Sequence, residues 1–341
     1  MERQIVTETT GRKQNGSSSK EAGAKERYRR WCESEPLIPI FSQPWWLDAV
    51  CTDGTWDVIV IEEKGVIVAT LPLYIRQRGP FSSITMPRLT PTLGPYITCP
   101  SDISHWKRLS WEMKILDAMI RQMPRTDRIV ICCHYKFTNW LPFYWAGYKQ
   151  QTAYTYMLPD LSDLDRVFAG FASSRKRNIR RAQKLVRVGY EMSPEAFYEH
   201  RERTLRKKGR KTSYSFELLS RIYYAAYARG AGRVIIHAED SAGRLHAALF
   251  VVWAPEGAYN LISTIDPNHR DSGAGSLLFH DVIRYVASFT NRFDFEGSMI
   301  ESVEGSYRRF GSLQTPYFIL TKTPSRLLRV HEAASLILRS A

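Results

Sequence analysis

One pattern occurs twice in the 341-residue chain and constrains its fold more than any other feature. In each copy, a β-rich run is followed by an acidic turn containing glycine and then by a longer apolar run, at residues 58–71 and again at residues 234–253. Two such runs around a polar glycine turn predict a β-hairpin. A further strand-like segment follows each hairpin, at residues 93–98 and 259–265. We interpret the pattern as an internal duplication; chance recurrence of a common hairpin is the alternative.

The length suits two domains of moderate size, and a hydrophobic content of 44% is enough for two cores. We therefore expect an α/β (α+β) fold with two tandem domains, each a mixed, mostly antiparallel sheet flanked by helices. The predicted divisions are a disordered basic tail at 1–30, an N-terminal domain at 31–160, a basic helical connector at 161–212, a C-terminal catalytic domain at 213–324 and a C-terminal helix at 325–341.

The sequence contains no segment that predicts secretion or membrane insertion. Residues 1–30 lack an apolar signal core, and no apolar run approaches the roughly 20 residues of a membrane-spanning helix. The five cysteines and eight histidines show no spacing typical of a metal site or a disulfide framework. We therefore expect a cytoplasmic protein without a bound metal.

The charge is strongly positive and concentrated. The net charge of +14 implies a polyanionic partner, and nucleic acid, an anionic membrane and a phosphate-rich small molecule all fit. Residues 175–187 predict an amphipathic helix with Ile179, Ala182, Leu185 and Val186 turned inward. Its basic face could clamp an RNA acceptor stem, hold a pyrophosphate-bearing lipid or nucleotide-sugar acceptor, or simply be solvated. The predicted substrate-binding residues on this helix are Arg175, Arg177, Arg180, Arg181 and Lys184.

A glycine-rich turn lies between a strand at 259–265 and a helix expected at 276–289. Glycines let the backbone approach a ligand closely, and free N–H groups at a helix start attract phosphate. This order predicts an anion cradle, although a tight turn that uses glycine only for packing is the alternative. The predicted residues of this phosphate-binding, cofactor-binding turn are Arg270, Gly273, Ala274, Gly275 and Ser276.

Residues 292–297 alternate apolar and acidic side chains, as in a strand with one polar face. A carboxylate on such a polar face can accept a proton as a general base. We take Glu296 as this base, with Asp294 and Glu239 in reserve. The alternative is a strand carboxylate paired with Arg292 or Arg308.

The order Arg-x-x-Gly-x-Gly at 270–275, a strand, then Tyr-x-x-Phe-Gly at 307–311 resembles the GNAT acetyltransferase superfamily. The segments 174–182 and 293–298 resemble its FemAB-type branch of tandem GNAT-fold transferases. The resemblance implies that both domains are GNAT-like, that the first motif holds the pyrophosphate of acetyl-coenzyme A, and that Tyr307 is the general acid. A packing tyrosine at a helix end is the alternative for Tyr307.

Members of that branch attach amino acids to peptidoglycan precursors from aminoacyl-tRNA, so the resemblance leaves two donors open, acyl-CoA and aminoacyl-tRNA. It implies an N-acyltransferase acting on an amine acceptor, such as a cell-envelope or lipid precursor. The expected partners are the phosphate-bearing donor, the acceptor, tRNA, and an anionic membrane touched peripherally. The alternative function is a non-catalytic basic protein that binds nucleic acid or an anionic surface.

Overall fold

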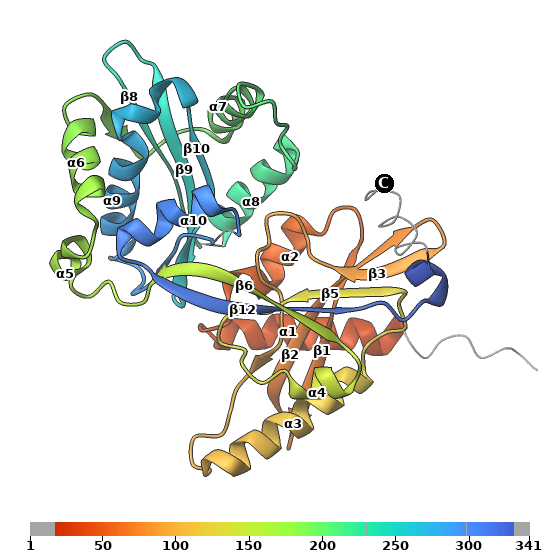
Figure 1. The fold of residues 1–341 in the computed structure, drawn as a ribbon. Coiled ribbons are helices and arrows are strands. Elements are labelled where there is room, and N and C mark those ends of the chain that lie inside the picture. Colours follow the sequence, from red (N-terminus) through yellow and green to blue (C-terminus); the bar gives the residue numbers. More distant parts are fainter. Residues whose placement is uncertain (1–17, 230, 298, 331–341) are drawn as a thin grey trace, which may run out of the picture.

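The computed structural model describes residues 18–229, 231–297 and 299–330, which form two lobes (Figure 1). Their strands belong to one twelve-stranded sheet in the order β1-β2-β3-β5-β12-β6-β11-β10-β9-β8-β7, with β4 paired to β2. The first lobe lies around β1 to β5 and the second around β7 to β11. The prediction of two tandem α/β units is confirmed.

The first lobe contains the predicted 58–71 hairpin. Its strands β1 and β2 pair antiparallel, and the helix at His105–Arg121 packs beside them with Leu116 fully buried. The elements are α1 (Ser18–Ser34), η1 (Ile40–Ser42), α2 (Pro44–Val50), β1 (Thr55–Glu63), β2 (Val66–Arg78), β3 (Phe81–Thr85), β4 (Tyr96–Ile97), α3 (His105–Arg121), β5 (Arg128–Cys132) and α4 (Leu141–Trp145).

The second lobe repeats the hairpin with β8 and β9, and β10 extends it as an antiparallel neighbour of β9. Helix α9 covers one face of these strands and α8 the other, in two separate apolar cores. The elements are α5 (Leu164–Ala169), α6 (Ser173–Ala182), β7 (Arg187–Gly189), α7 (Pro194–Arg206), α8 (Phe216–Ala228), β8 (Gly232–Glu239), β9 (Leu245–Ala254), β10 (Gly257–Ile265), η2 (Pro267–Ser272), α9 (Ala274–Val286), β11 (Phe293–Asp294), α10 (Glu301–Tyr307) and η3 (Arg308–Phe310).

Two long strands, β6 (Lys149–Leu158) and β12 (Leu313–Lys322), join the lobes (Figure 1). They pair antiparallel along their length, and β12 also pairs with β5 of the first lobe. The other end of β6 pairs with β11 of the second lobe. Strand β12, which falls within the predicted C-terminal domain at 213–324, therefore also extends the sheet of the first lobe.

The predicted connector at 161–212 is part of the second lobe. The apolar side of α6 enters its core through Ile179 and Ala182, and β7 pairs with β8. Leu185, predicted to face inward, is 49% exposed, because α6 ends at Ala182 and the helical spacing no longer holds.

The predicted tail at 1–30 is ordered from Ser18, where α1 begins; residues 1–17 lie outside the described residues. Few apolar residues suffice to dock this helix, because Tyr28 is fully buried and its hydroxyl donates to the Ser42 carbonyl oxygen at 2.6 Å. At the other end, residues 326–330 are helical, and the rest of the predicted C-terminal helix is outside the described residues. Across the described part of the chain, no helix combines the length and the hydropathy needed to span a membrane.

Candidate active site

Three strands meet at the junction of the lobes and place Asp294 between them. On one side, β10 pairs in parallel with β11, so that Tyr259 lies opposite Asp294. On the other side, β6 pairs antiparallel with β11, so that Met157 lies opposite the same residue. Asp294 is only 6% exposed, and its neighbours Phe293 and Phe295 are fully buried. The carboxylate is thus anchored in the centre of the sheet.

The chain turns sharply after Asp294, so the predicted alternating strand ends there. Glu296 has a left-handed φ of +56°, which is uncommon for a residue with a side chain and is a form of strain often found at functional sites. The Glu296 N–H donates to Asp294 Oδ1 at 2.8 Å, and the Gly297 N–H donates to Thr155 Oγ1 at 3.0 Å. The Thr155 hydroxyl in turn donates to Asp294 Oδ1. These bonds hold the turn around the Asp294 carboxylate.

The two carboxyl groups share a poorly solvated environment. Burial raises the pKa of Asp294 to about 6, although its hydrogen bonds from Thr155 and from the Glu296 N–H oppose the shift. Burial, and then the negative charge of Asp294, raise the pKa of Glu296 well above its usual value. Two nearby carboxylates resist ionising together, so the pair can hold a proton near neutral pH. Such a pair is suited to accept a proton from an incoming amine.

Tyr307 lies behind this turn, with its ring 5.4 Å from that of Phe295. Burial raises its pKa, and the charges of Glu296 and Asp294 add to the shift, which places the phenol within their electrostatic range. The Asn260 amide donates to the Phe295 carbonyl at 3.3 Å, while its buried Oδ1 has no hydrogen-bond partner among the described residues. The two predicted catalytic residues are therefore near neighbours in space.

A small cavity opens onto the carboxylates. It is lined from the first lobe by the loops around Thr92 and His134, and from the second by Tyr259, Asp294 and Glu296. The pocket therefore lies between the lobes.

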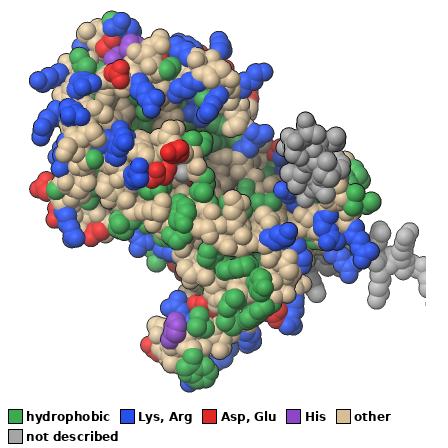
Figure 2. All heavy atoms as spheres, viewed as in Figure 1, with side chains coloured by type: hydrophobic (Ala, Val, Ile, Leu, Met, Phe, Trp, Pro, Cys, Tyr) green, Lys and Arg blue, Asp and Glu red, His purple; other side chains and the backbone are tan. Residues whose placement is uncertain are grey.

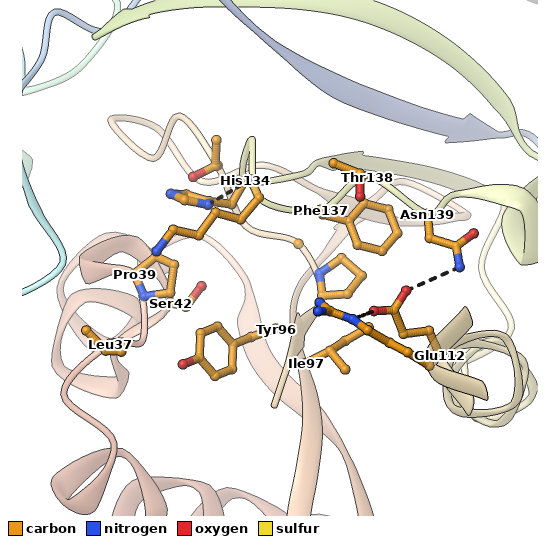
Figure 3. Close-up of a pocket in the computed structure, with 15 residues that line it drawn as sticks. Leu37, Pro39, Ser42, Tyr96, Ile97, Glu112, His134, Phe137, Thr138 and Asn139 are labelled. Carbon is orange, nitrogen blue, oxygen red and sulfur yellow. Dashed lines mark hydrogen bonds and ion pairs between the residues drawn. The ribbon is translucent and has the colours of Figure 1, made fainter. Parts of the chain in front are cut away.

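Thr92 and His134 also line a larger cavity of about 230 Å³ in the first lobe. Figure 3 shows its walls: Tyr96 and Leu37 on one side, and Glu112 and Asn139 on the other. The Asn139 amide donates to Glu112 Oε2 at 3.4 Å, which ties the loop after β5 to helix α3. Because the two cavities share residues, a long substrate could lie in the first lobe with one end at the carboxylates.

Glu256 connects the lobes close to this site. Its Oε1 accepts the backbone N–H of Ile40 at 2.8 Å, whereas Oε2 is buried without a hydrogen-bond partner among the described residues. Burial raises the pKa of Glu256 to about 7, well above the usual value for a glutamate. The protein therefore holds a buried carboxyl that ionises near neutral pH.

This carboxyl predicts a specific dependence of stability on pH. Because its pKa is raised in the folded state, its contribution is fully present below about pH 4.5 and is lost as pH rises through 7, by up to about 3 kcal/mol. We expect Glu256→Gln to be more stable than the wild type at pH 8, with the difference disappearing near pH 4.5. Urea unfolding at both pH values measures it, with Glu239→Gln, an exposed site, as control. A difference independent of pH would contradict this assignment.

The predicted anion cradle at the start of α9 is closed. Of its five residues, Gly273, Ala274, Gly275 and Ser276 are buried and only Arg270 is exposed. A Cβ on Gly273 would lie 2.3 Å from the carbonyl oxygen of Asn178 in α6, so the two backbones are in contact. The Ala274 N–H already donates to Ser272 Oγ. The left-handed Gly273, with φ of +82°, allows close packing of α6 on α9.

The basic residues of α6 differ in their surroundings. Arg175 is drawn inward, donates to Ser276 Oγ at 3.1 Å and to Ser306 Oγ at 2.6 Å, and lies over the Phe310 ring. Arg181 donates to the Asp271 carbonyl oxygen at 2.7 Å. The remaining three predicted substrate-binding residues are exposed: Arg177, Arg180 and Lys184.

Glu239, a reserve base, lies far from the carboxylate pair. Strand pairing puts Arg233 of β8 level with Asp294, and Glu239 is six residues further along β8, about 20 Å away at 3.3 Å per residue. It is also exposed. Within the described residues, no group of three or more His, Cys, Asp or Glu side chains is arranged to hold a metal ion.

Three contributors to the site have no signal in the sequence. Thr155 and Glu256 reach it only through contacts between residues more than 100 positions apart, and His134 is one of eight histidines with no distinguishing spacing. Segment 92–96, in contrast, is rich in turn-forming residues, as expected of a loop that lines a cleft.

Comparison with known proteins identifies the fold. Residues 172–298 match the family described as the acetyltransferase (GNAT) domain. None of the curated proteins matches the chain significantly.

Solved structures match over nearly the whole length. The crystal structure of FemX has a TM-score of 0.64 at 11% identity, covering 86% of this chain and 95% of FemX. The C-terminal domain of a putative lysylphosphatidylglycerol synthetase from Agrobacterium fabrum has a TM-score of 0.51 at 10% identity, covering 92% of this chain and 96% of that one. L-PGS from Bacillus licheniformis has a TM-score of 0.50 at 10% identity, with 89% and 94% covered. The predicted tandem GNAT fold of the FemAB type is thus confirmed at the level of the fold.

Proposed function

We propose that this tandem GNAT chain is an N-acyltransferase whose chemistry takes place between its lobes. The observation that carries the proposal is the carboxyl pair Asp294 and Glu296, buried at the end of β11 and facing a cavity lined by both lobes. The raised pKa values of both carboxyl groups and the strained backbone at Glu296 are features often found in active sites. The matched GNAT domain at 172–298 supports the same class of reaction.

In the proposed reaction, the amine nitrogen attacks the carbonyl carbon of the donor, and the bond between that carbon and the leaving oxygen or sulfur breaks. Glu296 takes the proton that the nitrogen loses, directly or through water. The negative charge of Asp294 raises the pKa of Glu296 and so makes Glu296 a stronger base. Tyr307 donates the proton that the leaving group needs. The cavity around Tyr96 and Glu112 would hold the body of the acceptor, with its amine directed to the carboxylates.

For the donor we propose an aminoacyl-tRNA, with acyl-CoA as the alternative. Residues Gly273 to Ser276 are buried and Gly273 packs against Asn178 of α6, which leaves little exposed surface for a pyrophosphate at the start of α9. A surface of clustered cations fits an extended polyanion better. Burial and the charges of Arg270, Arg201 and Arg210 lower the pKa of Lys208, and phosphates bound there would relieve this repulsion. Lys and Arg side chains gather over much of the second lobe in Figure 2.

The proposal is tested by supplying both donors. Purified protein is incubated with radiolabelled acetyl-CoA or with tRNA charged with radiolabelled amino acids, together with extracted cell-envelope precursors and lipids. We expect label to move from charged tRNA to an amine acceptor, and this transfer to fall steeply as salt rises. Transfer from acetyl-CoA alone would exchange the donor while keeping the reaction class.

A non-catalytic protein would give a different result. It would retain uncharged RNA with the same salt dependence and transfer label from neither donor. That outcome would leave the carboxyl pair without a chemical role and would contradict the proposed function.

A further inference from the structure

The first lobe exposes four large aromatic and apolar side chains, one at the start of α3 and three on α4. The exposed fractions are 66% for Trp106, 65% for Trp145, 59% for Tyr144 and 43% for Leu141. We call these four residues the aromatic surface. Figure 2 shows hydrophobic side chains gathered over this part of the lower lobe.

These side chains are not needed for the core. Phe143 and Tyr148, from the same stretch of sequence, fill the interior, with their rings 5.1 Å apart. Tyr144 instead packs against Trp140 at 5.5 Å and turns outward. The short helix α4 thus directs Phe143 into the core and Tyr144 and Trp145 to solvent. Exposed apolar groups gathered in this way commonly mark an interaction site.

The surroundings of the aromatic surface are basic. Lys149, four residues after the end of α4, is exposed, whereas Lys136 lines the 230 Å³ cavity. Beside Trp106, the Lys107 ammonium lies 5.7 Å from the indole ring. Lys322 reaches in from β12 and donates to the Ala146 carbonyl oxygen at 2.7 Å, next to α4. The surface therefore combines Trp and Tyr rings with positive charge.

We propose that the aromatic surface docks on the anionic phospholipid surface of a membrane. Trp and Tyr favour the headgroup region, because each has an apolar ring and a polar atom that stays hydrated. Lysines around them are attracted to anionic lipids. A second copy of this chain is a poorer partner, because both faces would bring the same positive charge together.

The location of this surface gives it a consequence for the cleft between the lobes. Glu112 of α3 and Asn139, two residues before α4, line the 230 Å³ cavity, so the cavity lies next to the elements that carry the aromatic surface. A docked protein would hold this cavity close to the lipid headgroups. The inference extends the proposed function, but binding to lipid can be measured whether or not the chain transfers acyl groups.

Vesicle flotation tests the inference directly. We compare vesicles of phosphatidylcholine with vesicles containing phosphatidylglycerol in addition, at low and high salt. We expect the wild type to bind the anionic vesicles and the double variant Trp106→Ala/Trp145→Ala to bind at least 10-fold more weakly. Tyr224→Ala, which removes a comparably exposed ring from the second lobe, is the matched control and should bind like the wild type.

A second measurement does not depend on how the variants fold. In the wild type, the tryptophan fluorescence should shift to the blue on adding anionic vesicles and become protected from a soluble quencher. Absence of vesicle binding, equal loss in Tyr224→Ala, or unchanged binding by the double variant would each overturn the proposal. Sedimentation of the lipid-free protein tests whether a second copy of the chain occupies the surface instead. A wild-type dimer that becomes a monomer in the double variant, together with no vesicle binding, would assign the surface to a second copy.

Discussion

Replacing Glu296 by glutamine is expected to lower acyl transfer by about 10²- to 10⁴-fold while leaving the fold intact. Glutamine keeps the size and backbone position of the glutamate but cannot accept the proton that the amine must lose, and loss of a general base has effects of about this size. The substitution should not destabilise the folded protein, because burial already disfavours the ionised form of the half-buried Glu296 side chain. Single-turnover transfer rates measure the effect, with thermal unfolding as the check on the fold.

Two further variants make this result specific. Glu239→Gln removes an exposed carboxylate about 20 Å along the sheet and should transfer at the wild-type rate. Asp294→Asn removes the negative charge that raises the pKa of Glu296, so the acidic limb of the pH–rate profile should move to lower pH. An active Glu296→Gln enzyme, or an unmoved profile in Asp294→Asn, would show that the pair is structural.

Replacing Gly273 by alanine is expected to destabilise the protein by about 3 kcal/mol or more. Two effects add: a side chain in the left-handed region costs about 1 kcal/mol, and the new methyl would lie 2.3 Å from the Asn178 carbonyl oxygen, forcing α6 away from α9. Urea unfolding measures the loss. The interface it would disrupt includes Ile179 and Ala182, which belong to the core of the second lobe.

Gly243 is the matched control, because it has a φ of +73° but no atom within 4 Å of the position of an added Cβ. Gly243→Ala should therefore show the conformational part alone, about 1 kcal/mol. Equal losses in the two variants would mean that α6 does not press on Gly273. The turn would then be open to a phosphate, and acyl-CoA would return as the favoured donor.

Much of the scaffold follows from the sequence. The 58–71 and 234–253 hairpins are local patterns, since alternating β-rich runs need only their own glycine turn to pair. The inward side of α6 follows equally from helical spacing, as the buried Ile179 and Ala182 show. The two tandem units were therefore predictable from local patterns alone.

The candidate site was predictable only in part. Its acidic residues stand out, because charged side chains interrupt an aromatic strand at 293–296, and Tyr307 stands at a recognisable helix end. Their partners did not stand out, because Thr155 and Glu256 are ordinary residues until β6 and the β9–β10 turn carry them to the junction. The strain at Glu296 was equally hidden, since nothing local forbids the strand from continuing.

The sequence by itself predicted both hairpins, the inward side of α6 and the acidic residues of the candidate site, because these patterns depend on neighbours within a few positions. The tertiary structure decided that Gly273 packs against Asn178, almost 100 residues earlier in the chain. It also decided which lobe receives β12 and which aromatic rings of α4 face solvent. These outcomes depend on which surfaces come into contact when the two lobes share one sheet. No local sequence pattern predicts those contacts.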